Sequence, residues 1–297
     1  MNYIFLGTPE FAVIILEKLI TAGFVPDVVV CNPDKPVGRK KVITPPPTKI
    51  LAEKYKINIL QPEILANCEL QTTKSDFFVV AAYSKIIPKE ILKIPRFGTI
   101  GVHPSLLPKY RGPSPIQTAI LNGDEITGTT LYLMDEKIDN GPILATSHLP
   151  IDNSDNYETL MKKLAELNAD LLIEFLRKIE PISNQQSVIS NLAIPQDESL
   201  VTYTKKFSTQ DAFIEPQDLE KAQGSTGSPQ EIRRLAIEID RKIRALNPEP
   251  GTFTLSLSKG GLSKRMKILE AKVIDEKLKI TKIQMEGKKP QNTCRVC

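Results

Sequence analysis

What this chain of 297 residues lacks argues against several protein classes. Its four cysteines are too few and too scattered for the disulfide framework of a secreted protein. No apolar run approaches the length that spans a bilayer, and the first residues carry no basic stretch ahead of an apolar core. We therefore expect a cytoplasmic enzyme or binding protein that does not enter membranes.

Two ligand classes are also disfavoured. Cys294 and Cys297 have the spacing of zinc ligands, but they lack a second pair or nearby histidines, and a structural zinc ion needs four ligands. We interpret them as part of a frayed tail and expect no metal site. No G-x-G-x-x-G motif follows the first apolar stretch, so a dinucleotide is not indicated.

The net charge of +4 hides an asymmetry. Residues 241–297 hold 14 basic and 5 acidic side chains, whereas the rest of the chain holds 25 basic and 30 acidic ones. A basic C-terminal segment on an acidic body favours a polyanion as partner. A merely solvated basic face is an equally good interpretation of charge alone.

The first 180 residues have the pattern of an α/β domain. Apolar stretches at residues 2–6 and 27–31 flank helical periodicity over residues 10–21, which predicts a βαβ unit. Thr8 is expected to cap that helix, with Pro9 at its first position. Near-continuous apolar strands predict a parallel, Rossmann-like sheet covered on both faces. Further strands are expected at residues 57–60, 77–82, 98–103, 128–134 and 143–149, and further helices at 48–55, 88–92, 115–121 and 156–179.

The last third of the chain has a different pattern. We interpret residues 181–202 as a polar linker, and the run over residues 207–227 as flexible. Ser228 and Glu231 form a capping box that opens a helix to about residue 246. Alternating stretches at residues 252–257, 266–273 and 278–285 predict antiparallel strands. Residues 203–297 are therefore expected to form a small β-barrel, similar to an OB fold.

A long loop at residues 32–47 is rich in proline and exposes four cations, Lys35, Arg39, Lys40 and Lys41. The prolines stiffen the loop. An ordinary solvated loop is one interpretation, but long loops in compact domains are more often functional.

His103 stands where an apolar strand ends and a Pro/Gly-rich loop begins. Ligands of open α/β sheets bind at the carboxyl ends of strands, and a histidine there can exchange protons near neutral pH. Asp139 leaves another strand end and could converge with it, fixing the tautomer of the imidazole. A buried core histidine and an aspartate that caps a turn are the simpler alternatives.

Two motifs resemble the folate-dependent formyltransferases: HPSLLP at residues 103–108 with YRG at 110–112, and MDEKIDNG at residues 134–141. Three more stretches are similar to the members of that family that formylate methionyl-tRNA, namely residues 7–12, the loop at 33–41 and KIRALNP at 242–248. The resemblance covers the chain nearly end to end.

The resemblance implies transfer of a formyl group from 10-formyltetrahydrofolate to the α-amino group of initiator methionyl-tRNA. It implies catalytic roles for His103 and Asp139. The implied folate contacts are Ser105, Leu106, Leu107, Pro108 and Tyr83, and the implied tRNA contacts are Arg39, Lys40 and Lys41. A monomer is expected, because no large apolar stripe is left over.

Gly101 departs from the family pattern. The family has an asparagine two residues before the histidine, whose amide helps to bind the formyl oxygen, and glycine has no donor to offer. Losing one such donor typically lowers turnover about 100- to 1,000-fold, so Gly101→Asn is expected to raise formyl transfer. Gly101 leaves open one alternative, a catalytically impaired tRNA-binding relative. A second alternative is a folate-dependent formyltransferase for nucleotide-linked amino sugars, which would share the first domain but need neither the Arg39 loop nor the basic barrel.

Overall fold

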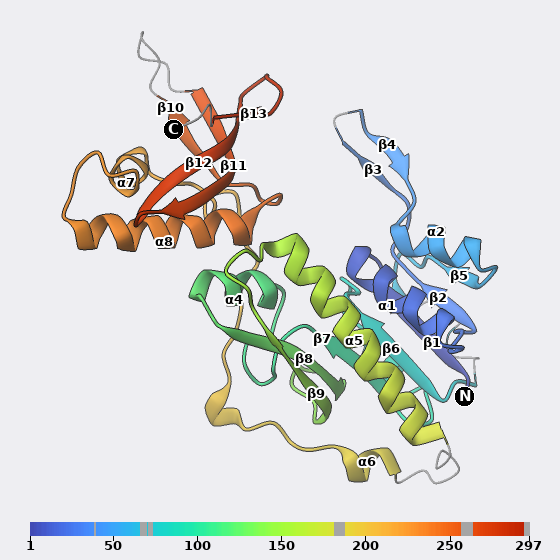
Figure 1. Ribbon diagram of the computed structural model, residues 1–297. Helices are drawn as coiled ribbons and strands as arrows, with labels where there is room; N and C mark the ends of the chain where they lie inside the picture. Colours follow the sequence, from blue (N-terminus) through green and yellow to red (C-terminus); the bar gives the residue numbers. More distant parts are fainter. Residues whose placement is uncertain (39, 66–69, 71–73, 181–187, 257–263, 294–297) are drawn as a thin grey trace. The chain divides into compact units, whose positions relative to one another are not determined.

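The computed structural model describes residues 1–293 except 39, 66–69, 71–73, 181–187 and 257–263 (Figure 1). The chain divides into two compact units, each described by itself. The first unit comprises Met1–Gly112, Ile126–Pro150 and Met161–Tyr203, and the second comprises Pro113–Glu125, Ile151–Leu160 and Thr204–Cys297.

A seven-stranded sheet in the order β5-β2-β1-β6-β7-β8-β9 forms the centre of the first unit. The strands from β5 to β7 are parallel, and β8 and β9 are added antiparallel. All residues of β1, β6 and β7 are buried, as their near-continuous apolar sequences predict. The strands are β1 (Tyr3–Gly7), β2 (Val28–Val30), β5 (Asn58–Leu60), β6 (Phe77–Ala81), β7 (Thr99–His103), β8 (Ile126–Leu133) and β9 (Ile143–Pro150).

The helices of this unit are α1 (Glu10–Thr21), α2 (Pro47–Lys54), α3 (Lys89–Leu92), α6 (Val188–Leu192) and, from Met161 on, α5 (Tyr157–Ile179). Ion pairs from α1 to α5 show that these two helices lie side by side; one joins Lys18 to Asp170 at 2.7 Å. The predicted cap of α1 is wrong by one residue. Pro9 is the N-cap, and the Thr8 hydroxyl instead accepts the backbone N–H of Asn32, 3.3 Å away.

The proline-rich loop contains structure that the sequence did not predict. Strands β3 (Lys35–Val37) and β4 (Val42–Thr44) pair as an exposed antiparallel hairpin. Its base is fixed by Asp34, whose carboxylate accepts hydrogen bonds from Lys49 at 2.9 Å and Gln61 at 2.8 Å. The Gln61 hydrogen bond, and then the Lys49 ammonium, lower the pKa of Asp34.

The second unit packs helices on an antiparallel sheet. Its helices are α4 (Pro115–Asn122), α7 (Pro216–Ala222) and α8 (Pro229–Leu246), and its strands are β10 (Phe253–Ser256), β11 (Lys264–Ile274), β12 (Lys277–Met285) and β13 (Gln291–Asn292). Helix α8 contacts α4, α7, β11 and β12. The core includes Leu219 of α7, Ile239 of α8, Ile268 of β11 and Leu278 of β12.

The C-terminal antiparallel domain is confirmed, and its sheet has the linear order β10-β11-β12-β13. Among the described residues no ladder joins β10 to β13, so this part of the chain forms an open sheet rather than a closed barrel. Helix α7 lies in the run expected to be flexible: Pro216 starts it and Leu219 anchors it in the core. Within the described ranges, no helix combines the length and apolar character that a membrane span requires.

Half of the predicted capping box of α8 forms. The Ser228 hydroxyl accepts the backbone N–H of Glu231 at 3.3 Å, while the Glu231 carboxylate pairs with Lys221 at 2.9 Å.

Ser228→Ala should therefore lower the free energy of unfolding of this unit by about 1 kcal/mol, measured by urea denaturation. Ser225→Ala, at an exposed position just before the helix, is the control and should change it by less than about 0.5 kcal/mol. Equal losses would contradict a capping role.

Candidate active site

Strand β7 carries His103 at its last position, where the residue is only 6 % exposed. The strand has the sequence TIGVH, so Gly101 and His103 lie on the same face. The backbone then turns into the loop that leads to Tyr110 and Gly112. His103 is thus held by a buried strand while its ring faces a loop.

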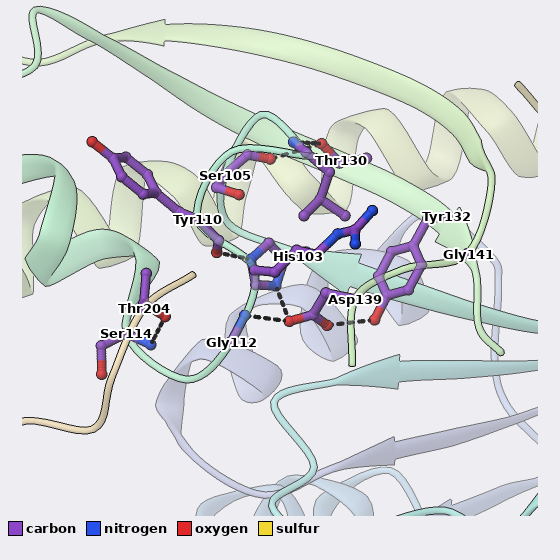
Figure 2. A network of polar contacts seen from close by, with 12 residues as sticks. His103, Ser105, Tyr110, Gly112, Ser114, Thr130, Tyr132, Asp139, Gly141 and Thr204 are labelled. Atoms are coloured by element: carbon purple, nitrogen blue, oxygen red, sulfur yellow. Dashed lines mark hydrogen bonds and ion pairs between the residues drawn. The ribbon is translucent and has the colours of Figure 1, made fainter. Parts of the chain in front are cut away.

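Asp139 lies beside His103, as Figure 2 shows. It comes from the connection between β8 and β9, and its side chain is 15 % exposed. The backbone N–H of Gly112 donates to Oδ2 at 2.7 Å, and the hydroxyl of Tyr132 donates to Oδ1 at 2.7 Å. The Nδ1 atom of His103 is 3.6 Å from Oδ2, an ion-pair distance that is too long for a hydrogen bond.

The imidazole of His103 lies between two acceptors. Its Nε2 atom is 2.9 Å from the carbonyl oxygen of Tyr110, opposite the Asp139 contact at Nδ1. A carbonyl oxygen can only accept, so Nε2 carries a hydrogen, and Nδ1 is the ring nitrogen that is left to take up or release a proton. This arrangement suits a group that holds a proton and releases it.

Both residues that supply these acceptors have left-handed backbones. The φ angle is +66° at Tyr110 and +50° at Asp139. A non-glycine residue in this region costs roughly 1–3 kcal/mol and persists only where its surroundings enforce it. The loops on the two sides of His103 are thus held in unfavourable conformations that aim an oxygen at each ring nitrogen.

Gly101 lies directly opposite Tyr132 in the β7–β8 ladder. A Cβ atom built at Gly101 would be 2.4 Å from Cε1 and 2.8 Å from the hydroxyl oxygen of Tyr132. The tyrosine ring thus fills the space into which a side chain at position 101 would project. The expectation that Gly101→Asn by itself restores a missing donor is wrong, because the asparagine would collide with a buried ring.

A second layer of side chains holds the Asp139 loop. Gln196 donates from Nε2 to the backbone oxygens of Asp139 at 2.9 Å and Gly141 at 2.8 Å. Its Oε1 atom accepts from the fully buried guanidinium of Arg111 at 2.7 Å, and Arg111 also pairs with Glu198 at 2.8 Å. Gln196 and Glu198 belong to the segment interpreted as a linker, and here that segment forms part of the support of the site.

The HPSLLP loop is fixed by Thr130 of β8. The Thr130 hydroxyl donates to the backbone oxygen of Ser105 at 2.7 Å and accepts the backbone N–H of Leu107 at 3.0 Å. Ser105 and Leu107 are buried, whereas Leu106 and Pro108 are half-buried. Ser105 and Leu107 therefore shape the loop, whereas the side chains of Leu106 and Pro108 face outward in part.

The remaining predicted residues lie on two other segments. Tyr83 follows β6 and is buried in the core cluster with Val80 and Ile91. Lys40 and Lys41 are exposed at the turn of the β3–β4 hairpin, and Arg39 lies outside the described residues.

Sequence reasoning did not find Tyr132, Gly112 or Gln196. The role of Tyr132 depends on the β7–β8 register, and Gly112 acts through its backbone. Gln196 is one of several amides in a polar segment, and nothing in its local sequence distinguishes it.

Two family models match the chain: formyl transferase over residues 1–176, and the formyl transferase C-terminal domain over residues 233–279. A methionyl-tRNA formyltransferase of Caldicellulosiruptor saccharolyticus is 41% identical over 261 residues, which are 86% of this chain and 76% of that protein. One of Thermotoga maritima is 38% identical over 256 residues, 84% of this chain and 74% of that protein.

Among solved structures, an N-formyltransferase of Helicobacter canadensis in complex with folinic acid and dTDP-3-aminofucose has a TM-score of 0.57. It is 20% identical and covers 92% of this chain, which covers 88% of that one. At this identity the likeness concerns the fold alone.

Gln196→Leu tests the second layer. The change removes the donor of two backbone oxygens and one acceptor of the Arg111 guanidinium, which keeps its pair with Glu198. The free energy of unfolding should fall by about 1–3 kcal/mol for each backbone oxygen that water cannot reach. Urea unfolding measures the loss. Gln223→Leu, at an exposed position of the other unit, is the control; if both variants lost the same small amount, Gln196 would not support the site.

Proposed function

This chain belongs to the formyl transferase family, and from that premise we propose that it transfers the formyl group of 10-formyltetrahydrofolate to the α-amino group of methionine on initiator tRNA. The observation that carries the proposal is the 38–41% identity to methionyl-tRNA formyltransferases over 84–86% of the chain. The buried His103–Asp139 pair, which lies within the part matched by the formyl transferase model, supports it.

The residues around His103 fit the chemistry that a formylated folate supplies when bound, namely an activated formyl carbon on a nitrogen leaving group. The transfer removes one hydrogen from the amine and places one on the departing nitrogen. A single group that takes the proton and gives it back balances the reaction. A buried imidazole beside a carboxylate is such a group.

His103 would also stabilise the oxygen of the formyl group as it becomes negative. The Nε2 atom is already bound to the Tyr110 carbonyl at 2.9 Å, whereas the Nδ1 contact with Asp139, at 3.6 Å, is not a hydrogen bond. We therefore assign both proton steps to Nδ1: it takes the amine proton as the C–N bond forms, then donates that hydrogen to the oxyanion, and finally passes the proton to the departing nitrogen. Asp139 would balance the positive charge of the imidazolium while the oxyanion exists.

The incoming amine needs little activation. An α-amino group has a pKa of about 7.7–8.0, so a substantial fraction is neutral and nucleophilic near neutral pH. Only the proton released as the new C–N bond forms requires a base, and His103 would accept it.

Ser105, Leu106, Leu107 and Pro108 would form one wall of the folate site. Because Thr130 already binds the Ser105 oxygen and the Leu107 N–H, the contacts of this wall would come largely from the half-buried side chains of Leu106 and Pro108. Tyr83, which follows β6, is the further folate contact that we propose.

Two basic surfaces would hold the tRNA. One is the β3–β4 hairpin, where Lys40 and Lys41 are exposed at the turn, together with Arg39, which precedes them in the sequence. The other is the open sheet of the second unit, where Lys272 of β11 lies directly opposite Lys279 of β12, both exposed. Like charges in such a pair destabilise a sheet, and bound phosphates would relieve the repulsion.

The remaining expectations follow from this function. Charged initiator tRNA is used in the cytoplasm, where we place the protein, and we propose that it acts as a monomer. The sugar-nucleotide alternative is weaker, because the likeness to the sugar N-formyltransferase is at 20% identity whereas the relatives named for methionyl-tRNA reach 41%.

The direct test is formylation of methionyl-tRNA with labelled 10-formyltetrahydrofolate, with a nucleotide-linked amino sugar as the competing acceptor. Wild type should formylate the tRNA, and His103→Asn and Asp139→Asn should each lower kcat about 100-fold or more. Wild type that formylates only the sugar, or that retains tRNA on a filter without transfer, would contradict the proposal.

A second test concerns the hairpin. Arg39→Ala should raise the KM for methionyl-tRNA about 10-fold, the size of one charge-assisted contact, and leave the KM for folate unchanged. Lys93→Ala, an exposed lysine of the same unit, is the matched control. The tRNA KM of wild type should rise steeply with salt. Equal losses for both substrates would show that Arg39 acts on the fold.

A further inference from the structure

Tyr132 links Gly101 to the catalytic carboxylate. It lies opposite Gly101 in the β7–β8 ladder, is only 3 % exposed, and donates its hydroxyl hydrogen to Asp139 Oδ1 at 2.7 Å (Figure 2). Its ring reaches across β7 over the bare Cα atom of the glycine. The formyltransferase motifs at residues 103–108 and 134–141 include neither residue of this pair.

The ring and the glycine depend on each other. Any side chain at position 101 starts with a Cβ atom 2.4–2.8 Å from three atoms of the ring. The ring cannot turn aside cheaply, because the residue is almost fully buried and a tyrosine has only two side-chain torsions. Gly101 is therefore the space that admits Tyr132.

The hydroxyl group is a constant donor. Burial first, and then the nearby Asp139 carboxylate, raise the pKa of Tyr132 well above 10. The group therefore keeps its hydrogen over the whole range in which the enzyme can work. Together with the N–H of Gly112 on Oδ2, it fixes both oxygens of Asp139 and so sets the direction in which the carboxylate faces His103.

We propose that Tyr132 is a positioning residue of the formyl-transfer site, whose hydroxyl, admitted by glycine at position 101, orients Asp139 toward His103. The inference rests on the proposed function and deepens it. It explains how a site without a side chain at position 101 keeps a polar group in that space. Tyr132 acts through Asp139, and the Gly101–Tyr132 pair works as one unit.

Tyr132→Phe is the first variant to measure, because it keeps the ring and removes only the donor. With methionyl-tRNA and 10-formyltetrahydrofolate, kcat should fall about 10- to 100-fold, the usual effect of a misplaced catalytic group. Both KM values should stay within about twofold. The pH dependence of kcat should differ from that of wild type, because Asp139 no longer holds the same direction toward His103.

The matched control is Tyr3→Phe. Tyr3 is also 3 % exposed, lies in β1 of the same sheet and donates its hydroxyl hydrogen to the carbonyl of Phe24 at 2.9 Å. Loss of the Tyr3 hydroxyl should lower the free energy of unfolding and leave kcat and its pH profile as in wild type. If Tyr132→Phe also left them unchanged, or raised KM alone, the inference would be overturned.

Substitution of Gly101 provides a second test of the inference. Gly101→Asn should lower kcat, and adding Tyr132→Leu, which makes room for the amide, should recover part of it, so that the two changes are not additive. A single Gly101→Asn variant faster than wild type would show that the ring is not fixed in this space and would overturn the inference.

A measurement that does not depend on catalytic turnover distinguishes this inference from the proposed function. The chain holds two histidines, and His148 is exposed on β9. In the nuclear magnetic resonance spectrum of ¹⁵N-labelled imidazoles, Tyr132→Phe should move the His103 signals and leave those of His148, while Tyr3→Phe should move neither. A wild type that formylates no amine but shows this response would refute the function and keep the positioning role. Unmoved His103 signals would refute the positioning role itself.

Discussion

The site depends on the side-chain carboxylate of Asp139, which is largely withdrawn from water. Such a group is stable only where donors and a positive partner replace the lost solvent. For Asp139 these are the Gly112 N–H, the Tyr132 hydroxyl and the imidazole of His103. Each comes from a different segment, so the loop after β7, the strand β8 and the end of β7 must all be in place before the pair can act.

Two neighbouring strands of the sheet and the loops that follow them supply these segments. Strand β7, in the buried parallel part of the sheet, ends at His103. Its antiparallel neighbour β8 carries Tyr132 on the same face of the sheet. The residues at positions 196 and 198 then hold the Asp139 loop through Arg111 and backbone oxygens. A hydrogen-bonded network of this kind orients the reacting groups before any substrate binds, which is the main way that such sites lower a barrier.

Much of the fold of the first unit was predictable from the sequence. Helix α1 occurs at the predicted residues 10–21, because its apolar spacing is regular, and His103 and Asp139 meet as expected. The β3–β4 hairpin was missed, because both strands are exposed and one contains Pro36, so no alternation marks them. Tyr132 and Gln196 act through a cross-strand register and a long-range contact, and neither can be deduced from a residue's own neighbours in the chain.

The fit between Gly101 and Tyr132 also restricts how such a site can change over generations. A side chain at position 101 that meets the tyrosine overfills the space, whereas glycine without the tyrosine leaves a hole; either state costs on the order of 1–5 kcal/mol. A lineage that exchanges one arrangement for the other must therefore pass through a less stable ancestor or alter both positions together. In a set of related sequences, the two positions should carry a shared history.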